Sequence, residues 1–335
     1  MYNGIINVYK EKGYTSSDVV AVMRGILGQR KVGHTGTLDP EADGVLPVCA
    51  GAGTKLVEEL TDHIKEYSAV MKLGVETDTQ DLTGKVTGTH EIDITEPELR
   101  HVILSFKGEY DQIPPMYSAL KVNGQKLCDL ARKGKTVERK PRRIKIYDIE
   151  IKSVDMPYVS FDVTCSKGTY IRTLCSDIGD KAGCGASMSS LVRTRVGDFK
   201  IEDTHKLAEL QKIAEQGHLE SVVIPVERYY ENLPAVVIGD EMRERLINGN
   251  SFGADAIEYM MSGCVKCKIR EEELSSLKKD EQEEDQKAAD IVAGAGQKVR
   301  VYNAQNFFYG MYEFGEDGIY HPDKMMLCES CGLQK

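Results

Sequence analysis

Hydrophobic and polar positions alternate in two stretches of the chain with the period of a strand that buries one face. The apolar positions are Tyr67, Ala69, Met71 and Leu73 in the first stretch, and Val159, Phe161, Val163 and Cys165 in the second. In two other stretches, 19–27 and 171–178, apolar residues recur every three or four positions, which predicts amphipathic helices. Ser16, Ser17 and Asp18 precede the first helix, as is typical of an N-cap. Strands and helices do not alternate regularly, so we predict an α+β domain with a mixed, mostly antiparallel sheet flanked by helices.

The pattern changes near residue 232. Beyond it the apolar segments become shorter and are separated by turn residues, and the segment FFYGMYEFGEDGIY is typical of a hairpin. We therefore expect two domains, residues 1–232 and a small β-rich domain at 233–335. A charged insertion at about 264–298 interrupts the second domain.

Composition and cysteine content indicate the compartment. The 335 residues, 41% of them hydrophobic, are enough for two buried cores. The start MYNGIINVYK lacks the apolar run of a signal peptide, and no stretch approaches the roughly 18 apolar residues that would span a membrane. Nine cysteines, an odd number, fit reduced thiols better than a disulfide framework. We expect a cytoplasmic protein without a membrane partner.

Charge is distributed very unevenly. The net charge of −10 argues against a nucleic-acid partner, but residues 126–145 carry nine basic and two acidic side chains. Gly134 and Pro141 interrupt this run, which favours a projecting arm over a helix face. Residue types alone leave polyanion binding and a merely solvated segment both open. Residues 271–290 carry nine acids and three lysines, as expected of a solvated helix or a disordered segment. Salt screens the two runs from each other beyond roughly 10 Å.

Three carboxylates gather in the short segment GHTGTLDPEADG. Asp39, Glu41 and Asp43 have the spacing that opens an EF-hand calcium loop, but Ala50 stands where a bidentate glutamate is required, so calcium is disfavoured. Asp39 followed by Pro40 also has the form of a helix N-cap with proline at the first helical position. Residue types alone leave a capping role and a chemical role for Asp39 both open.

Two CxxC pairs lie in the second domain. Four thiolates in two such pairs form a common structural zinc site, although their separation is longer than in a simple zinc ribbon. Free thiols are the alternative, and neither interpretation gives the cysteines a catalytic role. The four residues are Cys264, Cys267, Cys328 and Cys331.

Several segments in the same order resemble the tRNA pseudouridine-55 synthases of the TruB type. They include VGHTGTLDPEADGVLPVCAGAGTKL, EYSAVMKLGVETDTQDLTG, QIPPMYSALKVNGQKLCDLARKG and CSKGTYIRTLCSDIG, and YHPDKMM is similar to the end of a PUA-type RNA-binding domain. The resemblance implies the pseudouridine synthase fold and the isomerisation of uridine 55 in the T-loop of tRNA without a cofactor. Its implied partner is the T-stem-loop of tRNA, and we expect a monomer. One departure is Tyr9-Lys10-Glu11, where the family usually has Asp-Lys-Pro.

The same resemblance assigns roles to individual residues. It implies that Asp39 is the catalytic carboxylate, that Arg172 pairs with it, and that Tyr67 stacks on the target uracil, with its hydroxyl a candidate for proton transfer. Arg172 also lies off the apolar stripe of its helix, in the first turn, where a cation requires an anionic partner. The implied substrate-binding residues are His34, Tyr170, Leu191 and Lys10, with Arg139, Lys140, Arg142 and Arg143 in a basic RNA-gripping insertion at about 121–145.

Each assignment has a simpler alternative. Leu191 and Tyr67 suit a plain core or interface position, and Arg172 could pair with another surface acid. At the level of function, the alternatives are a catalytically idle RNA-binding or RNA-folding module and a related synthase that acts on other RNA uridines. Substrate choice depends on the shape of the whole RNA, which the sequence does not reveal.

Overall fold

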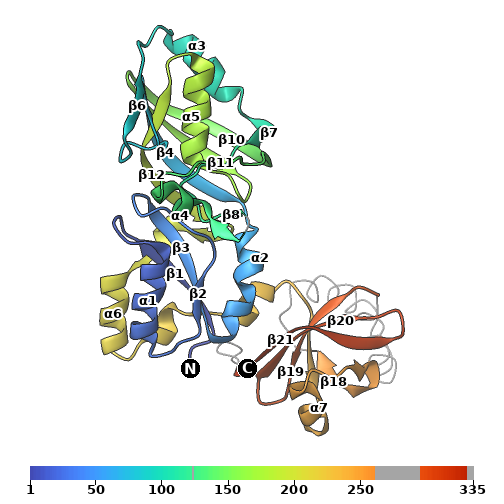
Figure 1. Cartoon of the computed structure of the whole chain (residues 1–335). Helices are drawn as coiled ribbons and strands as arrows, with labels where there is room; N and C mark the ends of the chain where they lie inside the picture. Colours follow the sequence, from blue (N-terminus) through green and yellow to red (C-terminus); the bar gives the residue numbers. More distant parts are fainter. Residues whose placement is uncertain (123, 261–294, 330–335) are drawn as a thin grey trace. The chain divides into compact units, whose positions relative to one another are not determined.

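The computed structural model describes residues 1–122, 124–260 and 295–329, and its chain forms two compact units (Figure 1). The larger unit comprises Asn7–Val48 and Val57–His218, and the smaller comprises Met1–Ile6, Cys49–Leu56 and Leu219–Lys335. Residues 219–232, which we had placed in the first domain, group with the smaller unit because Ile224 and Pro225 pair with the first residues of the chain. No described helix has the length and apolar character needed to cross a membrane.

Eleven strands among the described residues form one mixed sheet. Its main path runs β14 (His205–Lys206), β1 (Gly4–Lys10), β3 (Asp43–Ala50), β12 (Ala186–Val196), β4 (Lys65–Leu73), β11 (Tyr158–Cys165), β10 (Arg142–Asp155) and β7 (Gly108–Gln112). Beside this path, β2 (Val32–His34) pairs with β3, β13 (Phe199–Lys200) with β12, and β15 (Ile224–Pro225) with β1. Along this path each strand from β12 to β7 is antiparallel to the next, whereas β12 is parallel to β3. The predicted mixed, mostly antiparallel sheet is therefore confirmed.

The two alternating stretches are the central strands β4 and β11. Every second residue of β4 is buried, and the buried positions of β11 alternate in the same way, so both strands place one face in the core of the larger unit. Two small hairpins flank the sheet, β5 (Val75–Thr77) with β6 (Val86–Thr89), and β8 (Lys121–Val122) with β9 (Gln125–Lys126).

The two predicted helices are α1 (Ser16–Leu27) and α5 (Ile171–Ala182). Helix α5 packs against β12 and α3 (Glu96–Leu104), and α1 packs against α6 (Leu207–Glu215), as Figure 1 shows. The N-cap of α1 is Thr15, which forms a capping box with Asp18, so the predicted cap was placed one residue too late. The remaining helices of this unit are α2 (Val57–Thr61) and α4 (Leu127–Arg132), with a 3-10 turn at Ile201–Asp203.

The basic run at 126–145 is only partly a projecting segment. It begins in β9 and α4, continues through an irregular stretch at 133–141, and ends in β10, where Arg142 and Arg143 pair with β7. The prediction of a free arm is therefore wrong for its last residues, because their backbone belongs to the central sheet.

The described part of the smaller unit contains a second, six-stranded sheet. Its order is β17 (Phe252–Gly253), β21 (Ile319–Glu329), β20 (Phe307–Phe314), β19 (Lys298–Tyr302), β16 (Ala235–Ile238) and β18 (Ile257–Met260). Stacked and tilted aromatic rings such as Phe252, Tyr312 and Tyr320 fill its core, which confirms the predicted β-rich domain. Its helical segments are α7 (Arg243–Ile247) and 3-10 turns at Gly51–Leu56, Leu219–Val222, Val226–Tyr230, Asp240–Met242 and Ala254–Ala256.

Candidate active site

Asp39 lies in an irregular loop between β2 and β3. The amide of Ala42 donates to its carbonyl at 3.1 Å, which closes a turn, and β3 begins at Asp43. No helix follows Pro40, so an N-cap role for Asp39 is wrong. The Asp39 side chain is 36% exposed, which leaves its carboxylate open to a ligand.

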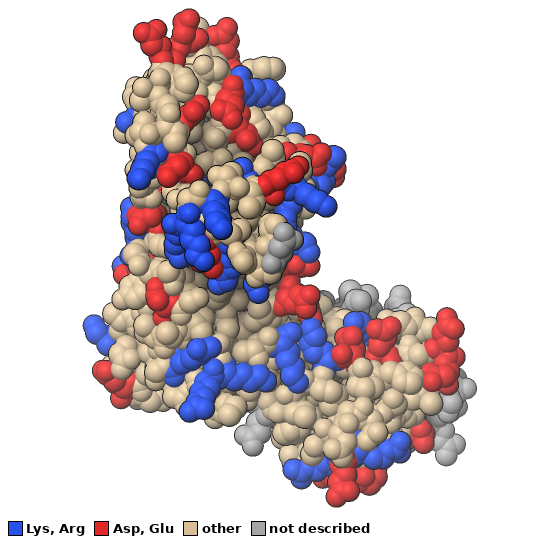
Figure 2. Space-filling model, viewed as in Figure 1, with Lys and Arg blue, Asp and Glu red and all other residues tan. Residues whose placement is uncertain are grey.

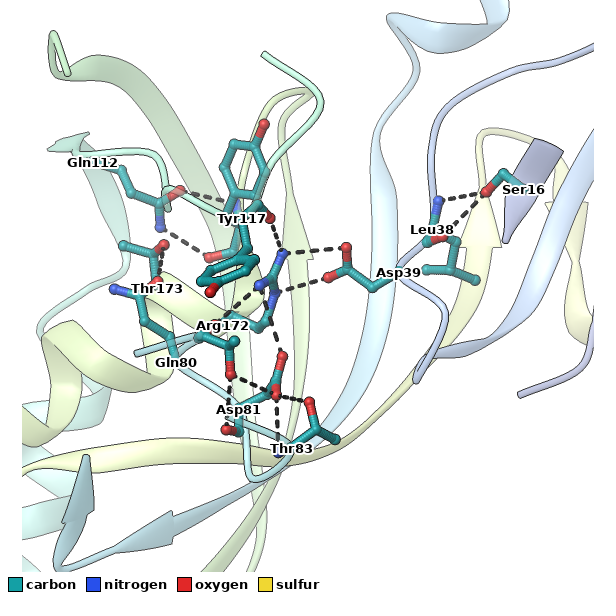
Figure 3. Close-up of polar contacts among 12 residues, drawn as sticks. Ser16, Leu38, Asp39, Gln80, Asp81, Thr83, Gln112, Tyr117, Arg172 and Thr173 are labelled. Carbon is teal, nitrogen blue, oxygen red and sulfur yellow. Dashed lines mark hydrogen bonds and ion pairs between the residues drawn. The ribbon is translucent and has the colours of Figure 1, made fainter. Parts of the chain in front are cut away.

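Arg172 forms a two-point ion pair with Asp39 (Figure 3). Its Nε lies 2.8 Å from Oδ2 of Asp39, and its Nη2 donates to Oδ1 at 3.2 Å. Arg172 comes from the first turn of α5 and its side chain is only 5% exposed. The alternative of a surface arginine paired with another acid is therefore wrong, and the partner is the one that the resemblance implied. A two-point ion pair of this kind restricts both the distance and the orientation of a carboxylate.

Three further groups contact the terminal nitrogens of the buried guanidinium. Nη1 donates to the carbonyl of Thr79 at 3.0 Å, Nη2 donates to that of Tyr117 at 2.8 Å, and Oδ2 of Asp81 lies 3.7 Å from Nη1. The guanidinium is thus held by two loops as well as by Asp39 (Figure 3). A buried cation needs such a set of acceptors, because the unpaired charge would be costly away from water.

Asp81 is a site residue that the sequence analysis did not identify. It is buried in a tight loop, where its Oδ1 accepts bonds from Thr79 Oγ1 at 2.8 Å and from the Thr83 amide at 3.0 Å. The segment TDTQDLTG could have indicated it, because its threonines can hydrogen-bond to the carboxylate and hold it in place.

Lys10 lies against the loop that carries Asp39 and is fully buried. Its ammonium donates to the carbonyls of Tyr14 at 2.7 Å, Glu11 at 3.1 Å and Pro40 at 3.3 Å. Burial lowers the pKa of Lys10 to about 8, an effect that nearby Asp43 and Asp39 partly oppose. We had expected a substrate contact, but the structure directs this ammonium inward, onto the backbone that follows Asp39.

Tyr67 and Leu191 share their surroundings in the core with Leu38, the residue before Asp39. All three are buried in one hydrophobic cluster, so the core alternative for Leu191 describes its surroundings correctly. Tyr67 on β4 is the cross-strand neighbour of Arg193 on β12. Burial raises the pKa of the Tyr67 phenol to about 12, with Arg193 acting in the opposite direction, so the hydroxyl is protonated near neutral pH.

His34 and Tyr170 lie at the ends of elements that lead into the site. His34 ends β2, and its Nδ1 accepts from the Gly36 amide at 3.3 Å. Burial, and after it the charge of Arg193, lowers the pKa of His34, which favours the neutral imidazole. Tyr170 is the N-cap of α5, two residues before Arg172, and burial raises the pKa of its phenol.

The four basic residues that we predicted to contact RNA differ in whether their side chains already bond to another group of the protein. Arg143 donates to both carboxylate oxygens of Asp111, at 2.8 and 3.1 Å, and Arg139 donates to the carbonyl of Pro114 at 3.0 Å. Lys140 and Arg142 are exposed. Figure 2 shows Lys and Arg side chains gathered over α4 on the visible face of the larger unit. A groove nearby is lined in part by Arg142, Arg143, Lys145 and Lys167.

No metal site is found among the described residues, none of which form a group of three or more His, Cys, Asp or Glu side chains able to hold an ion. Cys328 is buried. The other three cysteines of the CxxC pairs, Cys264, Cys267 and Cys331, lie outside the described residues, as does the acidic run at 271–290. The zinc site stays a prediction.

Together these groups form a small polar centre beside the hydrophobic cluster that contains Leu38 and Leu191. A half-exposed carboxylate is held by a buried guanidinium, with a neutral phenol and a neutral imidazole on neighbouring elements. A carboxylate held in this way can attack an electrophilic carbon or remove a proton without a cofactor.

Known proteins share both the sequence and the fold. Residues 24–171 match the N-terminal domain of the TruB family of pseudouridylate synthases, and 172–231 match a C-terminal domain of tRNA pseudouridylate synthase B. The tRNA pseudouridine synthase B of Lachnoclostridium phytofermentans is 46% identical over 97% of this chain and 100% of its own length. That of Clostridium kluyveri is 46% identical over 80% of this chain and 90% of its own length.

A solved structure of an H/ACA RNP bound to a substrate RNA containing 2′-deoxyuridine contains a similar chain. It aligns with 97% of this chain and 86% of that chain, at 25% identity and a TM-score of 0.63. This likeness confirms the expected pseudouridine synthase fold. On this sequence similarity and fold, the chain is an isomerase that belongs to the TruB family of pseudouridylate synthases.

Proposed function

We propose that this protein converts uridine to pseudouridine at position 55, in the T-loop of tRNA, and that Asp39 is the carboxylate that acts on the flipped-out nucleotide. The observation that carries the proposal is the Asp39–Arg172 ion pair, in which a half-exposed carboxylate is held by a buried guanidinium. The names of its similar relatives, tRNA pseudouridine synthase B, support tRNA as the substrate.

The reaction rearranges bonds within one nucleotide. The bond between N1 of uracil and C1′ of the ribose breaks, the base turns, and a bond from C5 to C1′ forms, while C5 loses its proton and N1 gains one. No atoms are gained or lost, so no cofactor is required. Asp39 either attacks C1′ as a nucleophile or removes the proton at C2′, and both routes need an ionised, oriented carboxylate. Arg172 supplies the orientation through its two contacts.

The target base must leave the stack of the T-loop to reach Asp39. Flipping a base costs a few kcal/mol, and stacking on an aromatic ring returns about 1 to 3 kcal/mol. In our proposal the ring of Tyr67 stacks on the uracil, with Tyr170 and Leu191 beside it, and His34 occupies the space that the base leaves. The phenol of Tyr67 acts in its protonated form, because burial raises its pKa to about 12.

The tRNA is held mainly by its phosphates. Exposed Lys140 and Arg142 and the basic groove next to Arg142 would release counterions when they meet the RNA backbone. An idle RNA-binding module would not need a buried arginine aimed at a half-exposed carboxylate, which favours an active enzyme.

Incubation with unmodified tRNA, followed by mapping of pseudouridine along the RNA, tests the proposal. The wild type should modify position 55 alone, and Asp39→Asn, which keeps the shape of the side chain and removes its charge, should modify nothing while still binding tRNA. Pseudouridine formation by Asp39→Asn would refute the role of Asp39. A product at other positions would assign a different RNA substrate.

A further inference from the structure

The backbone just before each partner of the ion pair is held by a buried polar side chain from a distant part of the chain. Before Asp39 this side chain is Ser16, the first residue of α1, which is 2% exposed. Its hydroxyl accepts from the amide of Leu38 at 2.9 Å and donates to the carbonyl of Leu38 at 3.1 Å (Figure 3). One hydroxyl thus satisfies both polar groups of the residue that precedes Asp39.

Loss of the Ser16 hydroxyl would leave two backbone groups of the catalytic loop without a partner. Leu38 is 3% exposed and packs in the main core, so water does not easily replace the hydroxyl. A buried, unpaired amide or carbonyl costs about 1–3 kcal/mol, and a loop without regular structure can relieve this cost by moving. Any such movement would shift Asp39, which is the next residue.

Gln112, the last residue of β7, has the same relation to Arg172. It is 1% exposed, its Oε1 accepts from the amide of Tyr170 at 2.8 Å, and its Nε2 donates to the carbonyl of Tyr170 at 3.1 Å. The same Nε2 donates to the Tyr110 hydroxyl at 2.7 Å. Because Tyr170 is the N-cap of α5, these bonds set where the helix begins and so where Arg172 in its first turn points.

We infer that Ser16 and Gln112 are positioning residues for the isomerisation, Ser16 acting through the backbone of Asp39 and Gln112 through that of Arg172. The inference rests on the proposed function. In the part of the chain that the structure describes, both side chains bond to backbone groups next to the pair or to Tyr110, and neither bonds to Asp39 or Arg172. Errors of about 1 Å in the position of a reacting group can lower a rate about 100-fold, so backbone anchoring of this kind is sufficient to control turnover.

The first test compares Ser16→Ala with Ser17→Ala. Both replace a serine in the first turn of α1, but Ser17 is exposed, so it provides a matched control. We expect the single-turnover rate on saturating unmodified tRNA to fall about 10- to 100-fold in Ser16→Ala and to stay unchanged in Ser17→Ala. The Kd for tRNA should stay within about twofold of the wild type in both, because no RNA contact is removed. Ser16→Cys, with a weaker donor and acceptor, should show a smaller loss and replaces Ser16→Ala if that variant does not fold.

The second test uses Gln112→Met and Gln112→Glu. Methionine keeps the length of the side chain and removes both bonds to Tyr170, so the rate should fall about tenfold or more at unchanged Kd. A glutamate at this position can accept from the Tyr170 amide, but it can donate to the Tyr170 carbonyl only when protonated. The rate of Gln112→Glu relative to wild type should therefore rise as the pH is lowered, which a purely structural loss would not produce.

The outcomes separate this inference from the proposed function. If the wild type forms no pseudouridine in tRNA, the proposed function fails. If the wild type is active and folded Ser16→Ala and Gln112→Met match its rate, only the positioning roles are refuted. A loss that appears in the Kd for tRNA instead of the rate also refutes them.

Discussion

The two partners of the ion pair should respond to mutation in opposite ways, because one is buried and the other is half exposed. Replacement of Arg172 by Met keeps much of its volume but removes the donors to the carbonyls of Thr79 and Tyr117. Replacement of Asp39 by Asn keeps the shape of a side chain that is 36% exposed. Both changes should stop turnover, but only the first should destabilise the fold.

The contacts of Arg172 set the size of the expected effect. A hydrogen bond from a charged donor contributes about 1.5–3 kcal/mol, and two backbone carbonyls depend on this guanidinium. The pair with Asp39 adds little, since water screens a carboxylate that is more than one-third exposed. We expect Arg172→Met to lower the free energy of unfolding by about 3–5 kcal/mol, in the range seen when one partner of a buried ion pair is removed. The melting temperature should fall by about 10 °C.

Asp39→Asn should change the melting temperature by no more than about 3 °C, because this carboxylate is more than one-third exposed and Arg172 keeps its bonds to Thr79 and Tyr117. Its turnover should be undetectable, whereas Arg172→Met should retain about 1% of the wild-type rate or less, the usual effect of losing one charged group that orients a reacting centre. Thermal unfolding followed by circular dichroism, together with single-turnover assays on tRNA, measures both quantities. Unfolding of Arg172→Met at the wild-type temperature would show that the guanidinium does not support the loops of Thr79 and Tyr117, and would refute the energetic reasoning.

Three further outcomes are expected. Replacement of Lys140 and Arg142 by Ala should lower the slope of log Kd for tRNA against log salt by about two, whereas Arg143→Ala should change it less because Asp111 already neutralises that guanidinium; equal slopes for the two variants would contradict this. Deletion of residues 271–290 should leave pseudouridine formation and the melting temperature nearly unchanged, because the segment combines high charge with few apolar residues; a large drop in melting temperature would contradict it. Protein purified without chelator should contain one zinc per chain if the CxxC pairs bind metal, and the zinc should be lost when the first cysteine of each pair is replaced by Ser; a metal-free wild type would exclude the site.

The fold was largely predictable because its central elements have clear periods. The alternation at 67–73 and 159–165 corresponds to β4 and β11, and the helical spacing at 171–178 corresponds to α5. Each pattern spans enough residues to distinguish a strand from a helix. The pairing of Arg172 with Asp39 was predicted only from the family resemblance, since the two residues are 133 positions apart.

Short segments leave alternatives open where one residue pattern fits two structures. Asp39 followed by Pro40 suits a helix start, but proline also favours an extended backbone before it, and here the chain turns into β3 instead. Arg172 lies off the apolar stripe of α5, which left pairing with a surface acid open as an alternative. It is buried because polar groups from loops at Asp39, Thr79 and Tyr117 converge on it, and helix periodicity contains no information about those loops.

The contacts that hold the site together are the least visible in the sequence, because each joins a side chain to the backbone of a remote residue. Ser16 is 22 positions from Leu38, and Gln112 is 58 positions from Tyr170. Every residue type carries a backbone carbonyl, so no sequence motif marks the residue whose backbone accepts such a bond. The residue that contributes the side chain can be recognised, since the alternation of β7 places Gln112 on the same face as half-buried Tyr110. A polar residue that a strand pattern places on the inner face needs a hydrogen-bond partner there. Where the strand lies next to a catalytic segment, the backbone of that segment is a candidate for this partner.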